Sequence, residues 1–419
     1  MKNRKIVTFY NLTKSFRVSC LILFLASPFL VMLLASSTAS AMDIEATVSA
    51  SNIHPGIGAV GDSYKPKTIT ARVAAGLYHS LIVKTDGALW VMGYNNDGQL
   101  GDGTNNTRST QVRVADGVAQ VAAGSVHSLF IKTDGTLWAM GWNRDGQLGD
   151  GTTDNRNTPV QVATGVAQVA AGVFHTLFVK TDGTLWAMGK NNDGQLGDGT
   201  TIDRSMPVQV VTGVAMSAAG SAHSLFIKTD GTLWVMGYNM DGQLGDGTIK
   251  ARSMPVQIDT GVIQVAAGGS YSLYVKADGS LWATGFNKYG QLGNGANNTC
   301  NRPIKIADGV LKVAGGCDHS LFIKTDGTLW AAGANYMYQL GDGTTEIQSA
   351  PVQITSGVAQ VSAGGSHTLF VKTDGTIWAM GSNYLGQLGD GTVTPRSTPG
   401  QVIIGASQGS TDSSRTKTQ

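Results

Sequence analysis

The sequence predicts an all-β protein, a seven-bladed β-propeller of four-stranded antiparallel blades with a 48-residue repeat. One motif occurs seven times, and its tryptophan returns at the same interval without an insertion. Apolar residues within each unit alternate over short runs, which is the period of strands rather than helices. Glycine-rich turns separate these runs, and such repeats bury their apolar faces against neighbours in a ring. The seven tryptophans are Trp90, Trp138, Trp186, Trp234, Trp282, Trp330 and Trp378.

Four short runs in each unit are the expected strands. In the third unit they are residues 159–162 (PVQV), 166–172 (VAQVAAG), 175–180 (HTLFVK) and 184–189 (TLWAMG). The turns between them contain glycine and are short enough for hairpins, so we expect the runs to pair in this order. A longer glycine-rich loop then leads to the next blade.

The two ends of the repeat region predict how the ring closes. The first unit has a second strand at residues 72–76 but no clear PVQV-type strand before it. The chain finishes with a surplus strand of that type at residues 399–402. We therefore expect the C-terminal strand to pair in the first blade and complete it. This pairing would cover the strand edges at the junction.

A secretory signal peptide is predicted at residues 1–41. Basic residues precede an apolar run at residues 20–36, and the small residues Ala39-Ser40-Ala41 favour cleavage after Ala41. An uncleaved membrane anchor is the weaker alternative, because the apolar run is short and contains Pro28. The sequence therefore predicts a secreted or periplasmic protein.

Composition and charge limit the partners of the mature chain. The whole chain has 30 Lys and Arg against 28 Asp and Glu, and five of the basic residues lie in the signal peptide. Because the mature chain is then slightly acidic and has no run of Lys or Arg, we expect no nucleic-acid partner. We also expect no stable membrane insertion after signal cleavage. The regions expected after the signal peptide are a polar lead-in at 42–62, the propeller at 63–404 and a disordered tail at 405–419.

The repeat resembles a known family. Its recurrent form VAAGxxHSLxxKTDGxLWxxGxNxxGQLGDGT is similar to the repeat of the regulator of chromosome condensation family, and the resemblance covers all seven units. The resemblance implies a seven-bladed propeller. It also implies one functional alternative, because the family's namesake is a guanine-nucleotide exchange factor that acts on a nuclear GTPase together with chromatin.

The recurrent histidines and tryptophans are interpreted as structural. His127 and Ser128 are neighbours on one strand, so they point to opposite faces and cannot relay a proton to each other. Three or four of the histidines would have to crowd the ring axis to bind one metal ion, and Tyr271 takes the place of one. We expect no catalytic residue, no metal site and no cofactor. The histidines are His79, His127, His175, His223, His319 and His367.

The loops of the GDG type are interpreted as turns rather than calcium sites. Their acidic residues do not have the spacing of known calcium loops, and Tyr289 and Asn294 replace two of the acids in the fifth unit. Aspartate and glycine are common in turns for conformational reasons. We expect the Gln-Leu-Gly segment to anchor the crossing between blades, and the tryptophans to fill the space between neighbouring sheets.

The mature chain has two cysteines, and the hairpin interpretation predicts that they face each other. With Asp308-Gly309 at the turn, outward pairing brings Cys300 opposite Cys317. In an oxidising compartment this geometry would permit a disulfide. The prediction depends on the register of the hairpin up to Cys300, which lies in the loop before the strand.

Departures from the repeat are the candidate binding residues. The two residues before each recurrent His or Tyr vary, and so does the residue after each Trp-x-x-Gly. Both sets are expected on one face of the disc, with the TDG turns on the other. Aromatic residues are common at the centre of protein interfaces, so we expect a partner-binding face there, although such residues also cover loops. The candidates are Tyr78, Tyr94, Trp142, Phe174, Tyr238 and Phe286.

The sequence therefore favours a non-catalytic protein-binding propeller, an interaction scaffold or an inhibitor-like binder, for an unidentified protein partner. Two alternatives remain: an exchange factor like the family's namesake, and an enzyme with a pocket at the propeller axis. The signal peptide counts against the first, since no nuclear GTPase or chromatin is expected outside the cytoplasm. The lack of a non-repeated constellation of acid, base and nucleophile counts against the second.

Overall fold

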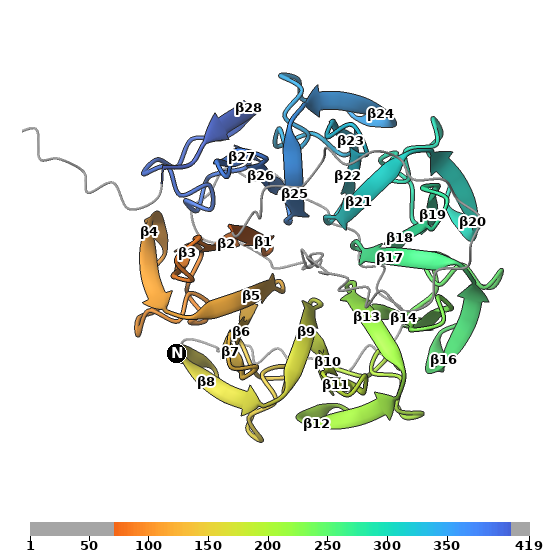
Figure 1. The fold of residues 1–419 in the computed structure, drawn as a ribbon, viewed down its shortest axis with the longest axis horizontal. Coiled ribbons are helices and arrows are strands. Elements are labelled where there is room, and N and C mark those ends of the chain that lie inside the picture. The colour runs from red at the N-terminus through yellow and green to blue at the C-terminus, as the bar shows by residue number, and fades with distance from the viewer. Residues whose placement is uncertain (1–70, 404–419) are drawn as a thin grey trace, which may run out of the picture.

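The chain folds into a ring of seven blades, each a sheet of four antiparallel strands (Figure 1). The computed structural model describes residues 71–403. The predicted signal peptide, the lead-in at 42–62 and the tail at 405–419 lie outside the described residues. Within residues 71–403 no helix is long and apolar enough to cross a membrane.

Each blade begins with an inner strand near the ring axis, followed by a second strand that pairs with it. The inner strands are β1 (Arg72–Ala75), β5 (Val118–Ala123), β9 (Val166–Ala171), β13 (Val214–Ala219), β17 (Val262–Ala267), β21 (Val310–Gly315) and β25 (Val358–Ala363). The second strands are β2 (His79–Val83), β6 (His127–Lys132), β10 (His175–Lys180), β14 (His223–Lys228), β18 (Tyr271–Lys276), β22 (His319–Lys324) and β26 (His367–Lys372).

The third strand of each blade carries the recurrent tryptophan, and the outer strand lies at the rim. The third strands are β3 (Leu89–Gly93), β7 (Leu137–Gly141), β11 (Leu185–Gly189), β15 (Leu233–Gly237), β19 (Leu281–Gly285), β23 (Leu329–Gly333) and β27 (Ile377–Gly381). The outer strands are β4 (Arg108–Ala115), β8 (Arg156–Ala163), β12 (Arg204–Val211), β16 (Arg252–Asp259), β20 (Cys300–Ala307), β24 (Gln348–Thr355) and β28 (Arg396–Gln401).

The predicted order of strands within a blade is wrong. The PVQV-type strand is the last strand of a blade and pairs with the tryptophan strand before it, as Trp186 does with Gln209. The short Thr-Gly link is therefore a crossing between blades, and the long glycine-rich loop lies within a blade. Five of the seven outer strands are eight-residue strands that contain proline and are half-exposed. Proline has no backbone N–H to donate to a neighbouring strand, so within a sheet it is typical of edge strands.

The predicted closure of the ring is also wrong in its detail. β28 pairs with β27, as the outer strand of the seventh blade, and the first blade already has its own outer strand, β4. Within residues 71–403 no strand is shared between the first and last blades. The error follows from the strand order, because a ring whose first described strand is an inner strand needs no extra strand from the other end.

The hydrophobic core lies between the blades rather than within one sheet. The cluster between blades 1 and 2 joins Leu81 and Leu100 of the first blade to Phe130 and Met140 of the second. Similar clusters lie at the other blade interfaces, including the junction of blades 7 and 1. Each sheet is therefore stabilised mainly by its two neighbours, as in other repeat proteins.

Buried histidines link each blade to the next near the axis. His127 Nε2 lies 3.1 Å from Thr176 Oγ1 of the following blade, and that hydroxyl donates to the carbonyl oxygen of Gln147 at 2.9 Å. Because a hydroxyl has one proton to donate, it accepts from the imidazole, and the ring is neutral with its proton on Nε2. A Cβ at Gly124 would lie 2.3 Å from the His127 ring, so a residue without a side chain is needed there.

The same link closes the ring. His367 Nε2 of the seventh blade lies 2.9 Å from Ser80 Oγ of the first, whose hydroxyl donates to Gln387 O at 2.7 Å. At the fifth blade Tyr271 replaces the histidine, and its hydroxyl donates to the carbonyl oxygen of His319 at 2.5 Å. The remaining links are His79 to Ser128, His175 to Ser224, His223 to Ser272 and His319 to Thr368. We call these seven contacts the hub links.

The recurrent tryptophan is held by contacts within its own blade. Trp138 stacks on Phe130 with a centroid separation of 6.2 Å, and the Lys132 ammonium lies 4.6 Å from the indole. The indole nitrogen donates to Thr136 Oγ1 at 2.9 Å, and this hydroxyl donates to Asp134 Oδ1 at 2.6 Å. Trp138 is half-buried and packs against the cluster shared with blade 1, so it fills part of the space between neighbouring sheets.

The hub links predict that acid destabilises the fold. Burial lowers the pKa of five of the six hub histidines to about 3 and that of His223 to about 4. An unfolded histidine has a pKa near 6.5, so the unfolded chain binds more protons below that pH. The contribution of these neutral histidines to the free energy of unfolding should be complete above pH 6.5 and should decrease as the pH falls from 6.5 toward 3. Each histidine contributes at most about 1.4 kcal/mol per pH unit.

Urea unfolding between pH 7.5 and 5 measures this slope, and His127→Gln should reduce it by about one sixth, since one of six equivalent groups no longer titrates. A slope that is the same in the native chain and in the variant would show that His127 does not take up a proton on unfolding.

A second prediction concerns Trp90, whose turn lacks the hydroxyl that the other turns provide. Ala88 stands where Thr136 lies in the second blade, and no described residue accepts a hydrogen bond from the buried Trp90 Nε1. Ala88→Thr should restore the acceptor and raise the free energy of unfolding by about 1 kcal/mol. Urea unfolding of Ala88→Val is the control, because valine has the shape of threonine but no hydroxyl. Equal stability of the two variants would contradict the assignment.

Candidate functional site

The two variable sets lie side by side on one face of the disc. The backbone N–H of Tyr94 donates to the carbonyl of Tyr78 at 2.9 Å, and Trp142 bonds in the same way to Val126. The equivalent bond is present in all seven blades. Next to it lies the N-x-x-G turn that follows the third strand, such as residues 95–98. We call this face the N-turn face, and the opposite face, which carries the TDG turns, the TDG face.

The six predicted partner-binding aromatics are all half-buried, and several contact each other or a cation. Tyr78 and Tyr94 meet edge to face at 6.4 Å. The Lys190 ammonium lies 5.1 Å from the Phe174 ring, and the Trp142 indole donates to a carboxylate in its own turn. These side chains support the loops around them, so they form the floor of the face rather than its outermost surface.

The outermost residues are at the first middle position of the N-x-x-G turns, which sequence reasoning missed, whereas the second middle position is half-buried or, at Met337, buried. Met240, Tyr336 and Tyr384 occupy the first of these positions and expose 51%, 53% and 58% of their surface. Exposed side chains of this size are unusual on a sheet-rich body and mark contact surfaces when they gather. The residues at this first middle position in blades 1 to 7 are Asn96, Arg144, Asn192, Met240, Lys288, Tyr336 and Tyr384.

The second middle position divides the face into two parts. In blades 1 to 4 it is always aspartate, which we call the acidic half: Asp97, Asp145, Asp193 and Asp241. In blades 5 to 7 it is Tyr289, Met337 and Leu385. Burial raises the pKa of Asp97 and Asp193, opposed by the positive charges of Arg144 and Lys190 respectively. The two parts offer a partner different chemistry.

Four tyrosines give the other part its character, which we call the aromatic half: Tyr289, Tyr336, Tyr338 and Tyr384. Tyr289 and Tyr336 come from neighbouring blades and meet edge to face at 6.1 Å, and Phe286 packs on Tyr289 at the same distance. The half-buried aromatic floor and the exposed tyrosines are therefore continuous at blades 5 and 6.

Tyr338 has a strained backbone. Its φ is 62°, and it is the only non-glycine residue among the described residues with a positive φ. Every other N-x-x-G turn has glycine at this position, for example Gly98 and Gly386. The left-handed region costs a side-chain-bearing residue about 1–2 kcal/mol, and such strain is found mainly where function requires it. The sequence shows this departure directly, as the one turn that reads Asn-x-x-Tyr.

The aspartates of the GDGT loops are committed to structural hydrogen bonds. Asp102 Oδ1 accepts from Asn95 Nδ2 at 3.1 Å and from the Thr104 hydroxyl at 2.7 Å, and Oδ2 pairs with Arg108 at 2.7 Å. Burial alone would raise the pKa of Asp102, but the bonds from Thr104 and Arg108 outweigh it and lower the pKa. No three His, Cys, Asp or Glu side chains within residues 71–403 are grouped to hold a metal ion.

Cys300 and Cys317 are not joined by a disulfide. The hairpin that would align them does not form, because β20 is the outer strand of blade 5 and β21 is the inner strand of blade 6. Cys300 lies opposite Gly285, at the position that Arg252 has in blade 4. Cys317 is buried in the turn before the next histidine. The prediction was wrong because a crossing between blades was read as a hairpin.

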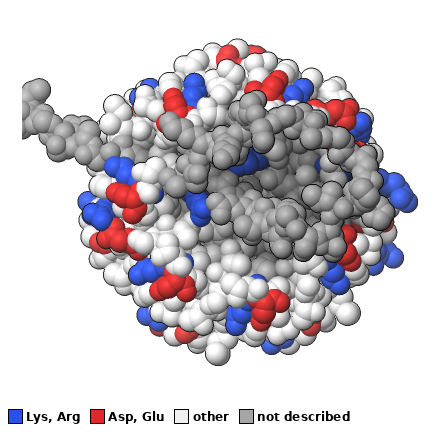
Figure 2. Space-filling view, in the orientation of Figure 1, with Lys and Arg blue, Asp and Glu red and all other residues white. Residues whose placement is uncertain are grey.

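Charged side chains on the rim include both signs. Figure 2 shows acidic and basic side chains of the described chain interspersed around the disc. Several belong to the repeated loop pair that joins arginine to aspartate, as in Arg156 with Asp150. In this pair the Asp150 side chain is only 4% exposed, so the pair is partly buried and belongs to the loop's internal structure.

Sequence models of the regulator of chromosome condensation (RCC1) repeat match the chain throughout the ring. The first model matches residues 86–131, 134–179, 182–227, 230–275, 278–323 and 326–371. The second matches residues 71–99, 118–147, 166–195, 262–291 and 358–387. A comparison with curated protein sequences gave no significant match.

Solved structures of similar fold include human WBSCR16, with a TM-score of 0.67 and 24% identity over 76% of this chain and 94% of that chain. Yeast RCC1 (Prp20), solved with Kap60 bound, has a TM-score of 0.70 and 19% identity over 85% and 92%. Prp20p from Saccharomyces cerevisiae, described with its binding properties to Gsp1p and histones, has a TM-score of 0.68 and 20% identity over 82% and 88%. At these identities the likeness shows the fold.

The strained turn gives a testable stability difference. Tyr338→Gly should be more stable than Tyr338→Ala by about 1 kcal/mol, because both variants lose the phenol ring but only glycine tolerates a φ of 62°. Urea unfolding of both variants measures it. Gly386→Ala, in the matching turn of blade 7, should lose more than this, because its added Cβ would also lie 2.4 Å from the Cα of Ser109. Equal stability of the two Tyr338 variants would contradict the left-handed assignment.

Proposed function

The chain belongs to the regulator of chromosome condensation (RCC1) repeat family, and from this premise we propose that it is an exported, non-catalytic propeller that binds a protein partner through its N-turn face. The strongest support is the aromatic half of that face. Two of its tyrosines are more than half exposed, and a third is kept on a strained backbone where every other blade has glycine.

The chemistry of the face suits a protein partner. Tyrosine offers a large rigid surface together with a hydroxyl, and aromatic residues dominate the binding energy of many protein interfaces. The acidic half adds four carboxylates on the neighbouring blades, which favour a partner with basic groups at that side of its contact surface. The proposed partner therefore presents an apolar patch next to basic side chains.

The hub histidines support a non-catalytic role. They are fully buried, hydrogen-bonded to the next blade and neutral, so they lie away from any face that a substrate could reach. Their regular repetition is that of a structural device. A reaction would need a group that differs from its repeats and meets a partner group of complementary chemistry.

Export is part of the proposal and rests on the order of residues 1–41 described above. Two yeast structures of similar fold are of a protein described with Kap60, Gsp1p and histones as partners. Those partners are not transferred to this chain, since an identity of 19% or 20% supports the fold alone and an exported protein would not meet them.

A comparative pull-down tests the proposal. The bait is the chain from Met42 onward, and the prey is the envelope fraction and medium of the producing cell. Tyr336→Ser with Tyr384→Ser should lose the partner, because the two most exposed side chains of the aromatic half are removed without emptying the core. We expect at least a tenfold loss of captured partner, since two anchor side chains each contribute more than about 1 kcal/mol.

The matched control is Met206→Ser with Met254→Ser, two side chains of similar size on outer strands that are each 66% exposed. It removes as much exposed apolar surface at the rim and should leave capture unchanged. If the control variant loses the partner, or if the tyrosine variant still captures it, the contact lies elsewhere on the disc.

A further inference from the structure

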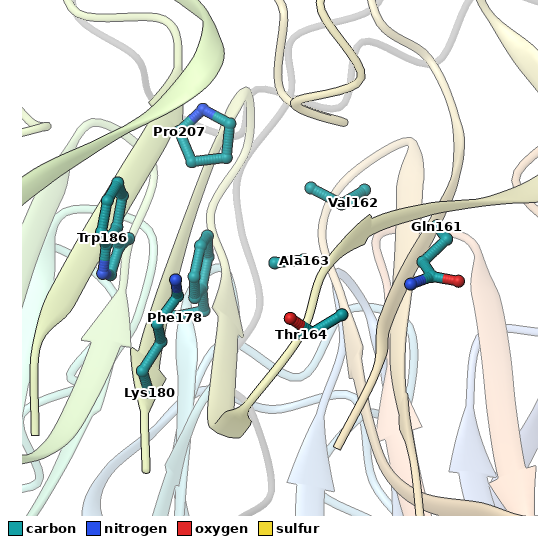
Figure 3. A pocket seen from close by; sticks show the side chains of 8 residues that line it. All are labelled: Gln161, Val162, Ala163, Thr164, Phe178, Lys180, Trp186 and Pro207. Atoms are coloured by element: carbon teal, nitrogen blue, oxygen red, sulfur yellow. The ribbon is translucent and has the colours of Figure 1, made fainter. Parts of the chain in front are cut away.

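A pocket opens between blades 2 and 3 at the TDG end of the strands (Figure 3). It is lined on one side by Phe178, Lys180 and Trp186 of blade 3 and on the other by residues 161–164 at the end of β8, with Pro207 at its upper edge. Lys180 is the last residue of β10, whereas the N-turn face lies at the beginning of that strand. The pocket is therefore at the opposite end of the strands from the proposed protein-binding face.

The same place between blades 4 and 5 is filled by a side chain of the chain itself. Asp259, the last residue of β16, accepts a hydrogen bond from Lys276 Nζ at 2.7 Å and from the Tyr274 hydroxyl at 2.7 Å. Lys276 Nζ lies 5.2 Å from the centre of the Trp282 ring. Burial alone would raise the pKa of Asp259, but the bonds from Lys276 and Tyr274 outweigh it and lower the pKa.

The pocket lining differs from the equivalent residues between blades 4 and 5 at three aligned positions, one of which, Val162 against Ile258, keeps its apolar character. Asp259 corresponds to Ala163, and Tyr274 corresponds to Phe178. Aspartate occurs at this position in blade 4 alone: the residues across the seven repeats are Ala115, Ala163, Val211, Asp259, Ala307, Thr355 and Ile403. The lysine and tryptophan are present at both interfaces. Replacing the aspartate by alanine therefore leaves the cation and the aromatic wall in place and removes the carboxylate.

Lys180 has its charge available in this pocket. Its ammonium lies 4.5 Å from the centre of the Trp186 ring, and no carboxylate of the described residues forms an ion pair with it. Asp182, the acid of the adjoining turn, instead accepts bonds from the Thr184 amide and hydroxyl at 2.9 and 2.6 Å. The lysine is half-buried, so a carboxylate that reaches it gains a partly desolvated contact.

We propose that the pocket between blades 2 and 3 binds an aspartate or glutamate side chain of a partner polypeptide, in the manner in which Asp259 fills the equivalent place between blades 4 and 5. A polypeptide source fits because the pocket lies beside β8, an edge strand whose outer backbone groups have no neighbouring strand in the sheet. A chain running along that edge would bring an acidic side chain to Lys180 and its apolar carbons to Phe178 and Pro207.

The chain's own sequence provides the probe. A peptide with the sequence of residues 256–261, VQIDTG, blocked at both ends, carries the Asp259 carboxylate, and the same peptide with asparagine is its control. Binding is followed by NMR through the eight tryptophan indole N–H signals, with Trp186 assigned from Trp186→Phe. The aspartate peptide should shift the Trp186 signal with at least tenfold higher apparent affinity than the asparagine peptide.

Filling the pocket from within should abolish the effect. Ala163→Asp, alone or with Phe178→Tyr, copies the arrangement that the chain already accommodates at Asp259 and should weaken peptide binding at least tenfold. Ala307→Asp makes the same substitution between blades 5 and 6 and should leave the Trp186 response unchanged. Opening the other pocket with Asp259→Ala should give a new response at Trp282, which the native chain lacks.

Equal shifts with the aspartate and asparagine peptides would overturn the proposal, as would full binding by a well-folded Ala163→Asp chain. No response of Trp186 at millimolar peptide would also overturn it. The inference is independent of the proposed function, because its variants lie at the other end of the strands. A failed peptide titration would leave the result of the tyrosine pull-down unaffected. A failed pull-down would leave the response of Trp186 to the peptide unaffected.

Discussion

The seven hub links are the constraint on which the rest of the structure depends. Each joins a buried ring nitrogen or phenol to a polar group one blade onward, and burial makes an unmade bond there costly. Because donor and acceptor occupy equivalent places in their repeats, each blade is joined to the next at the same position of its strands. The N-turns and TDG turns are then presented at regular positions on two faces.

Much of the fold follows from the sequence, and the part that does not has a physical cause. The tryptophan spacing and the alternation of apolar residues are enough to predict seven four-stranded blades. They are not enough to predict which strands share a blade, because a two-residue link is equally suited to a hairpin and to a crossing between blades. Pro207 and its half-exposed neighbours mark an outer edge, whereas the buried residues of Val166–Ala171 mark the axis. The mistaken disulfide between Cys300 and Cys317 followed from the same choice.

The candidate site was predictable in place but not in detail. The variable residues beside the histidines lie at the N-turn face, yet Tyr94 and Trp142 are half-buried, whereas Met240 and Tyr336 in the neighbouring turns are exposed. Exposure depends on which residue of a turn points away from the disc, and composition does not give that direction. Tyr338 is the exception, because a tyrosine where six other turns have glycine is visible in the sequence alone. The pocket between blades 2 and 3 could not be predicted from the sequence, because it is recognised only by comparison with the equivalent place between blades 4 and 5, which Asp259 fills.

In the part of the chain that the structure describes, blades 7 and 1 share no strand, and this has a consequence for how such a ring changes in evolution. Every boundary between blades falls at a Thr-Gly-type link, and each blade is one uninterrupted segment of chain. Duplication or loss of one segment in the gene would therefore add or remove a whole blade with its donor and its acceptor intact. A ring closed by a borrowed strand would have one blade that cannot be copied in this way. Here each of the seven blades is such a unit, and the divergent turns of blades 5 to 7 are among the features that distinguish them.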